Sequence, residues 1–150
     1  MFQGSRSHIK TRTMEQTTLQ NYRHRLALGH ATYYAFGGLW PLLSMPTFEA
    51  VMGPKVGEWL VRTIALILLL VSSLLLDHAL NKRADDLTLR RIAFGISFIL
   101  GTVAIITTLG GWLSWIFLLD GAMHLLLAAA WGVLWIHSRS VRTDTFSAQG

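Results

Sequence analysis

Four long apolar segments, separated by shorter polar stretches, constrain this chain more than any other feature of its sequence. They cover residues 26–43, 59–76, 92–109 and 112–136. A helix that crosses the apolar core of a bilayer needs about 20 predominantly apolar residues. A helix of a soluble bundle would carry a polar stripe on its solvent-facing side, and these segments lack one. We therefore predict an all-α integral membrane protein, with four spans packed as an antiparallel helix bundle.

The composition agrees with a membrane location. Charged residues make up only 14% of the chain, against roughly 25% in a typical soluble domain. The mean hydropathy is +0.44. Cysteine is absent, which excludes disulfide bonds, thiolate metal sites and a cysteine nucleophile.

The distribution of positive charge predicts the orientation of the spans. All 13 lysines and arginines except Lys55 and Arg62 lie before the first span, between the second and third, or after the fourth. Under the positive-inside rule both termini are then cytoplasmic. The basic residues would meet anionic lipid headgroups, so the net charge of +5 requires no nucleic-acid partner. We predict a polar basic cytoplasmic segment (1–25), a four-span bundle (26–137) and a polar cytoplasmic tail (138–150).

The loops carry turn and capping signals. Glu49 suits the positive N-terminal end of a short helix after the first span, and residues 53–54, Gly-Pro, would end it. Its apolar side chains place this helix in the outer membrane interface. Residues 109–111 form a tight turn, which makes the third and fourth spans antiparallel neighbours. Asp85 or Asp86 can cap the third span.

Small residues spaced four apart predict which helix faces pack together, because small side chains let helices approach closely in a membrane. Tryptophans at the span ends, Trp131 among them, are expected to anchor in the interface. Leu68, Leu69 and Leu75 are expected to face lipid. The predicted inward rows are Gly29, Tyr33, Gly37 and Pro41; Ala93, Ser97 and Gly101; and Asp120, His124, Ala128 and Gly132.

Asp120 and His124 are the strongest candidates for a functional site. They are four residues apart and share a helix face. At 1.5 Å per residue they lie about 12 and 18 Å from the start of the fourth span. Ionisable groups at that depth cost roughly 3 kcal/mol or more each. One interpretation is a site that handles a ligand or a proton. The other is a polar clamp, in which a neutral His124 bonds Asp120 or a Thr or Tyr across the bundle.

The sequence assigns no metal or cofactor. A bis-histidine haem needs two histidines at similar depth on facing helices, and His30 and His124 differ in depth by roughly 11 Å. His78 and His137 match His30 better, but all three lie near the interface, where histidine is common. We predict no cofactor, with haem or quinone as the alternatives. Nothing marks a serine as an activated nucleophile, so we assign no catalytic residue.

Three stretches carry a resemblance to known sequences: residues 31–41 read ATYYAFGGLWP, residues 48–55 FEAVMGPK and residues 59–63 WLVRT. They resemble a group of small uncharacterised bacterial membrane proteins with four spans, a G-L-W-P stretch and an F-E-A-V-T-G-P-K loop. This chain has Met52 where the pattern usually has Thr. The resemblance covers residues 26–136 and implies a bacterial inner membrane. The residues that it picks out are Glu49, Lys55, Trp59 and Asp120. We take as the outer-loop motif Phe48, Glu49, Gly53, Pro54, Lys55 and Trp59.

We expect an accessory or assembly subunit of a larger membrane complex, with the lipid bilayer and other membrane proteins as partners. The small size, the poor catalytic signals and the rows of small residues favour this role. The alternative is a bundle that binds a lipid or a small ligand, or an enzyme that acts on a lipid-soluble substrate. The face of Asp120 and His124 would then line the pocket.

Overall fold

The computed structural model describes the backbone of residues 4–53, 57–81 and 86–147, and the side chains of residues 17–53, 57–81 and 86–136. Within these ranges the protein is helical and contains no strand, which confirms the all-α prediction. The helices are α1 (Gly4–Leu43), α2 (Met45–Met52), α3 (Glu58–Leu80), α4 (Leu87–Leu109) and α5 (Ile116–Ser147).

Three helical segments are long and apolar enough to cross a membrane: α3, α4 and the Ile116–Ile136 part of α5. They correspond to the second, third and fourth predicted spans and indicate a membrane protein. The first predicted span, residues 26–43, is the C-terminal part of α1, and α1 is not one of the three. Its hydropathy is lowered by His30, Tyr33 and Tyr34, which we describe below.

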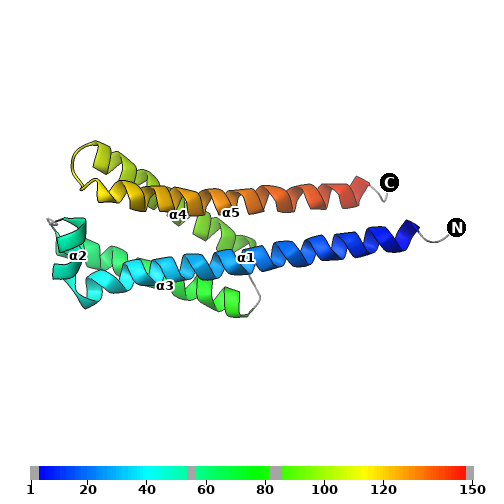
Figure 1. Ribbon diagram of the computed structural model, residues 1–150, viewed down its shortest axis with the longest axis horizontal. Coiled ribbons are helices and arrows are strands. Elements are labelled where there is room, and N and C mark those ends of the chain that lie inside the picture. Colours follow the sequence, from blue (N-terminus) through cyan, green and yellow to red (C-terminus); the bar gives the residue numbers. More distant parts are fainter. Residues whose placement is uncertain (1–3, 54–56, 82–85, 148–150) are drawn as a thin grey trace.

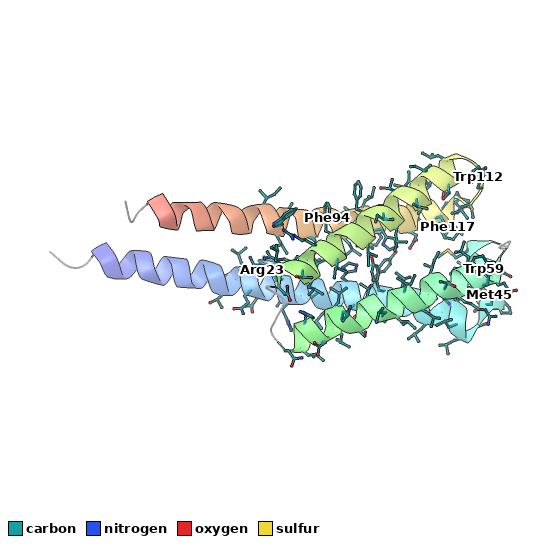
Figure 2. All side chains as sticks on the ribbon, turned by 180° about the vertical axis from the view of Figure 1, so that it is seen from behind. Arg23, Met45, Trp59, Phe94, Trp112 and Phe117 are labelled. Carbon is teal, nitrogen blue, oxygen red and sulfur yellow. The ribbon has the colours of Figure 1, made fainter. Side chains whose placement is uncertain are left out.

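The long helices form two antiparallel pairs, α1 with α3 and α4 with α5 (Figure 1). One end of the molecule carries α2 and the α4–α5 turn, and we call it the loop end. At the opposite end of the helix pairs, where Arg23 lies in Figure 2 and beyond which α1 and α5 project, the chain also carries Arg25, Arg90 and Arg91. We call it the basic end. In Figure 2, Trp59 and Trp112 lie at the loop end. The pairs meet around one cluster of buried residues: Ala27, Ala31, Tyr34, Val71, Leu75, Ala79, Leu89, Ala93 and Trp131.

The structure confirms the short helix in the first loop. Proline occupies the first turn of α2, and Gly53 ends the helix with a φ of 86°, which glycine adopts without strain. The backbone N–H of Gly53 donates to the carbonyl oxygen of Glu49 over 2.8 Å. Two residues of the outer-loop motif, Pro54 and Lys55, lie outside the described residues.

The cap of α4 and the turn after it also agree with the prediction. The Asp86 carboxylate accepts a hydrogen bond from the backbone N–H of Thr88 over 2.8 Å. This bond stabilises the ionised form, so the pKa of Asp86 lies below its ordinary value. Asp85 lies outside the described residues. After α4 the chain turns at Gly111, whose φ is 78°, and α5 returns beside α4.

The predicted packing row is right for α4 and wrong in part for α1. Ala93, Ser97 and Gly101 are all buried, as expected. In α1, however, Gly29 is exposed, and Gly38 makes the close approach to α3. A spacing of four residues fits several faces of a glycine-rich helix, and only the position of α3 selects one of them.

Two further expectations about orientation are wrong. Leu75 was expected to face lipid and is fully buried, because α3 turns the face of Ser72, Leu75 and Ala79 toward α1. Leu68 and Leu69 are half-buried. Trp131 was expected to anchor in the interface, yet only 1% of it is exposed. A tryptophan near the end of a span turns inward when a polar partner for its N–H lies inside the protein.

The close approach of α1 and α3 makes a prediction for Gly38→Ala. The added Cβ would lie 2.7 Å from the carbonyl oxygen of Ala65 and 2.8 Å from the Cγ of Leu69. We expect the free energy of unfolding to fall by about 1–3 kcal/mol. Unfolding in detergent micelles, followed by circular dichroism, measures it.

Gly29→Ala is the matched control, since it is the same change in the same helix with no atom within 4 Å of the new Cβ. Alanine should be neutral there, or stabilising by up to about 1 kcal/mol. Equal effects of the two substitutions would contradict the close approach of α1 to α3.

Candidate functional site

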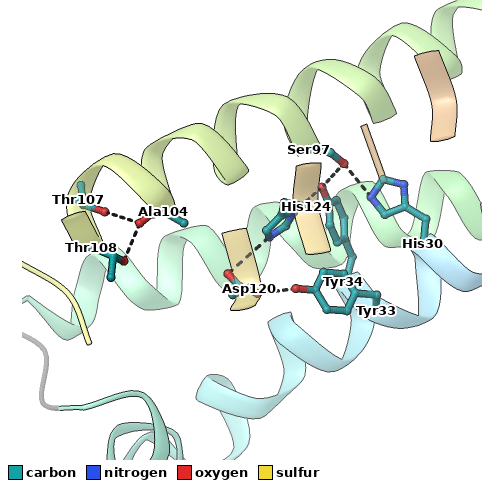
Figure 3. Close-up of polar contacts among 9 residues, drawn as sticks. All are labelled: His30, Tyr33, Tyr34, Ser97, Ala104, Thr107, Thr108, Asp120 and His124. Atoms are coloured by element: carbon teal, nitrogen blue, oxygen red, sulfur yellow. Dashed lines mark hydrogen bonds and ion pairs between the residues drawn. The ribbon is translucent and has the colours of Figure 1, made fainter. Parts of the chain in front are cut away.

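A network of polar and aromatic side chains crosses the interior between the two helix pairs (Figure 3). We call it the polar network. It joins three helices, which are α1, α4 and α5. Its members are His30, Tyr33, Tyr34, Ser97, Asp120, His124 and Trp131.

Helical spacing and close packing together bring these side chains into contact. His30 and Tyr34 are four residues apart in α1 and share a face, as Asp120 and His124 do in α5. The α4 helix approaches α5 closely at glycine: a Cβ on Gly101 would lie 3.0 Å from the carbonyl oxygen of Gly121. Ser97, one turn away from Gly101, is thereby held near His124.

The half of the polar network nearer the basic end is tightly bonded. The indole Nε1 of Trp131 donates to Nδ1 of His30 over 3.0 Å. On the other side of the ring, Nε2 of His30 lies 3.2 Å from the Ser97 hydroxyl. That hydroxyl lies 2.9 Å from the Tyr34 hydroxyl. All four residues are buried, so these bonds replace the water that the groups lose on folding.

The other half ends at a carboxylate. The Tyr34 hydroxyl lies 3.5 Å from Nδ1 of His124, and Nε2 of His124 lies 3.7 Å from Oδ2 of Asp120. The Tyr33 hydroxyl donates to Oδ1 of Asp120. The clamp interpretation expected His124 to bond Asp120 or a Thr or Tyr across the bundle, and His124 lies near both Asp120 and Tyr34. His124 is buried, whereas 31% of the Asp120 side chain is exposed.

The chemistry of the donors gives the bonds one direction. An indole N–H can only donate, so Nδ1 of His30 accepts and a neutral His30 carries its proton on Nε2. The Ser97 hydroxyl oxygen accepts the hydrogen bond from Nε2–H of His30, and the Ser97 hydroxyl can donate to the Tyr34 hydroxyl oxygen. Tyr34 can then donate to Nδ1 of His124, which places the His124 proton on Nε2, facing Asp120. One consistent set of protons therefore serves the hydrogen bonds from Trp131 to His124. The His124 proton then faces the Asp120 carboxylate, whose Oδ2 lies 3.7 Å from Nε2.

Sequence reasoning found two members of this network as a pair and missed how the others join them. The depths counted along the helices placed His30 and His124 too far apart to act together. The side chains of Ser97 and Tyr34 connect the two histidines. Tyr33 and Ser97 were placed on inward rows without a partner. The signal available in the sequence was the spacing of His30 and Tyr34 within an apolar segment.

Four of the six residues of the outer-loop motif are described, and they lie at the loop end, around α2. Phe48 is buried, and its ring packs edge-on against Trp40 with 5.7 Å between ring centroids. Glu49 is half-buried in α2, and Gly53 ends this helix. Trp59 is 71% exposed at the start of α3, as an interfacial anchor would be. The four described residues of the motif thus lie in or next to α2 and at the start of α3.

The histidines considered as haem ligands can now be placed in part. Both ring nitrogens of His30 lie within hydrogen-bonding distance of side chains in the same chain. The side chain of His137 lies outside the described residues. Over the part of the chain with described side chains, no three His, Asp or Glu residues gather as a metal site requires. The two hydrogen bonds of His30 therefore join it to other side chains of the protein.

The fold and the network together define a helical membrane protein with a polar interior. Comparisons of the chain with protein-family models, curated proteins and solved structures found no match. The resemblance to small four-span bacterial membrane proteins therefore stays a prediction.

The polar network makes a prediction for Ser97→Ala. This change removes the group that bridges His30 and Tyr34 and leaves two buried polar atoms without that partner. We expect a loss of about 1–3 kcal/mol in the free energy of unfolding. Ser73→Ala is the control, since the exposed Ser73 hydroxyl donates only to the Leu70 carbonyl oxygen of its own helix. If both substitutions are neutral in thermal unfolding, the network does not stabilise the fold.

Proposed function

We propose that this protein is an accessory or assembly subunit of a larger complex in a bacterial inner membrane. In this proposal residues 26–43 form a fourth span, and both termini lie in the cytoplasm. The observation that supports it is the projection of α1 and α5 beyond the helix pairs at the basic end (Figure 1). These two projecting segments would contact a partner subunit.

The lengths of the helices support a docking role for the projection. The α1 helix has 40 residues, whereas α3 and α4 have 23 each. At 1.5 Å per residue, α1 is longer by about 25 Å. Helices in water are marginally stable unless a face packs against something. Just before the core begins at Ala27, Tyr22 is 61% exposed, which is a large aromatic surface for a partner to cover.

The polar network supports a structural role for the interior. Its hydrogen bonds run from one side chain of the protein to the next. Buried polar groups that satisfy one another specify one arrangement of the helices. A subunit that acts by docking needs a rigid shape of this kind.

The test of this proposal is the mass of the protein extracted from native membranes in a mild detergent. We expect the full chain to elute in a large complex of defined stoichiometry. A variant that lacks residues 1–16 should elute near the protomer mass with an unchanged unfolding midpoint, because the buried core cluster begins at Ala27. A full chain that elutes as a lone monomer would overturn the proposal.

One observation favours the alternative, a bundle that binds a lipid or a small ligand. Asp120 accepts at the end of the polar network, and 31% of its side chain is exposed. A ligand with a hydrogen-bond donor or a positive charge could reach its carboxylate. The same site would serve an enzyme that acts on a lipid-soluble substrate.

The double variant Asp120→Asn with His124→Ala separates the two functions. If the face binds a ligand, the variant should lose a co-purifying molecule that mass spectrometry detects in the wild type. If the protein is an assembly subunit, the large complex should persist. A lower unfolding midpoint as the only change would leave the network with a clamp role alone.

A further inference from the structure

A groove of about 390 Å³ opens at the basic end, between the start of α4 and α5. It lies apart from Asp120, toward the opposite end of α5. Two arginines and four apolar or aromatic side chains line it, and none of the six is acidic. They are Leu87, Arg90, Arg91, Phe94, Trp131 and Trp135. Figure 2 shows Phe94 near the start of α4.

We propose that this groove binds one anionic phospholipid. The phosphate would lie against the exposed Arg91, and an acyl chain would run along α4 over Phe94. The proposal is independent of the assembly role proposed above.

The position of the groove suits a phospholipid. Leu87 is the first residue of the apolar helix α4, and Trp135 directly precedes Ile136, the last residue of the apolar part of α5. The groove therefore lies where both apolar segments end. Headgroups meet acyl chains at this level of a bilayer, and tryptophan rings concentrate there.

The charge of the groove favours an anionic headgroup. Arg91 is exposed, and its planar guanidinium can hold two phosphate oxygens at once. The neighbouring Arg90 also lines the groove but is buried, so it adds positive charge behind Arg91. Because the lining has positive charge and no carboxylate, a headgroup with net negative charge is favoured over a zwitterionic one.

An apolar path leads away from the arginines. The rings of Phe94 and Phe98 are stacked with 5.9 Å between centroids and 7° between planes. Phe98 is 51% exposed, so the path continues on the outer surface of α4. On the α5 side, a Cβ at Gly132 would lie 3.6 Å from the Phe94 ring. This is van der Waals distance, so the Phe94 ring lies beside α5. An acyl chain can pack along these rings.

Trp131 connects the groove to the polar network. It lines the groove and donates its N–H to His30. A lipid in the groove would therefore pack against a residue that holds α5 to α1. Since a ligand that binds only the folded protein stabilises it, occupancy should raise the unfolding midpoint.

The experiment measures lipid retention by native mass spectrometry, and thermal unfolding, with the full chain in detergent micelles. The probes are phosphatidylglycerol, phosphatidylcholine and inorganic phosphate. We expect one phosphatidylglycerol to be retained per protomer and to raise the unfolding midpoint, and the other two probes to do neither. Arg91→Gln should weaken retention about fivefold, the effect of one basic residue at an anionic surface. Arg25→Gln is the matched control, an exposed arginine at the same end outside the groove, and should leave retention unchanged.

Quenching of tryptophan fluorescence by phosphatidylglycerol with brominated acyl chains provides a second readout. The quenched fraction should fall in Trp135→Phe and stay the same in Trp112→Phe, which alters the loop end. Equal retention in Arg91→Gln and Arg25→Gln would overturn the proposal, because it would indicate diffuse attraction. Equal shifts with phosphatidylcholine or with inorganic phosphate would overturn it too. A midpoint shift that accompanies only a dimer mass would assign the groove to a second copy of the chain.

Discussion

The hydrogen bond from the indole N–H of Trp131 to His30 is the interaction on which the rest of the interior depends. An indole can only donate, so it sets the tautomer of a neutral His30 and, through it, the direction of the bonds through Ser97 and Tyr34. The bond also joins α5 to α1, which belong to different helix pairs. In an apolar surrounding a lost partner is costly, because water is not there to replace it.

The same constraint explains how the two helix pairs combine. Each pair packs internally at glycine, where backbones approach closely, Gly38 against Ala65 and Gly101 against Gly121. These contacts lie within each pair, so they do not determine where one pair lies along the other. The hydrogen bonds of Ser97 with Tyr34 and His30 join the two pairs, and a shift of one residue would separate the bonded atoms. Close packing holds each pair together, and the polar network sets how one pair lies on the other.

The two ends of the molecule differ in chemistry, and this difference organises the proposed functions. The loop end presents exposed tryptophans and the short helix α2. The basic end presents arginines, the projecting ends of α1 and α5, and the groove beside Trp131. A partner subunit and an anionic lipid would both meet the protein at this end. Because Trp131 lies between the groove and the network, binding there would act on the stability of the whole interior.

The sequence by itself determined the helical class, three of the membrane-length helices, the loop helix and the inward row of α4. These features follow from local spacing and hydropathy, which each segment carries alone. Only the tertiary structure decided that His30 and His124 share a network, that Leu75 and Trp131 face inward, and that Gly38 contacts α3. The physical reason is that the rotation and axial register of one helix against another depend on the partner's side chains. A depth counted along one helix does not contain that information.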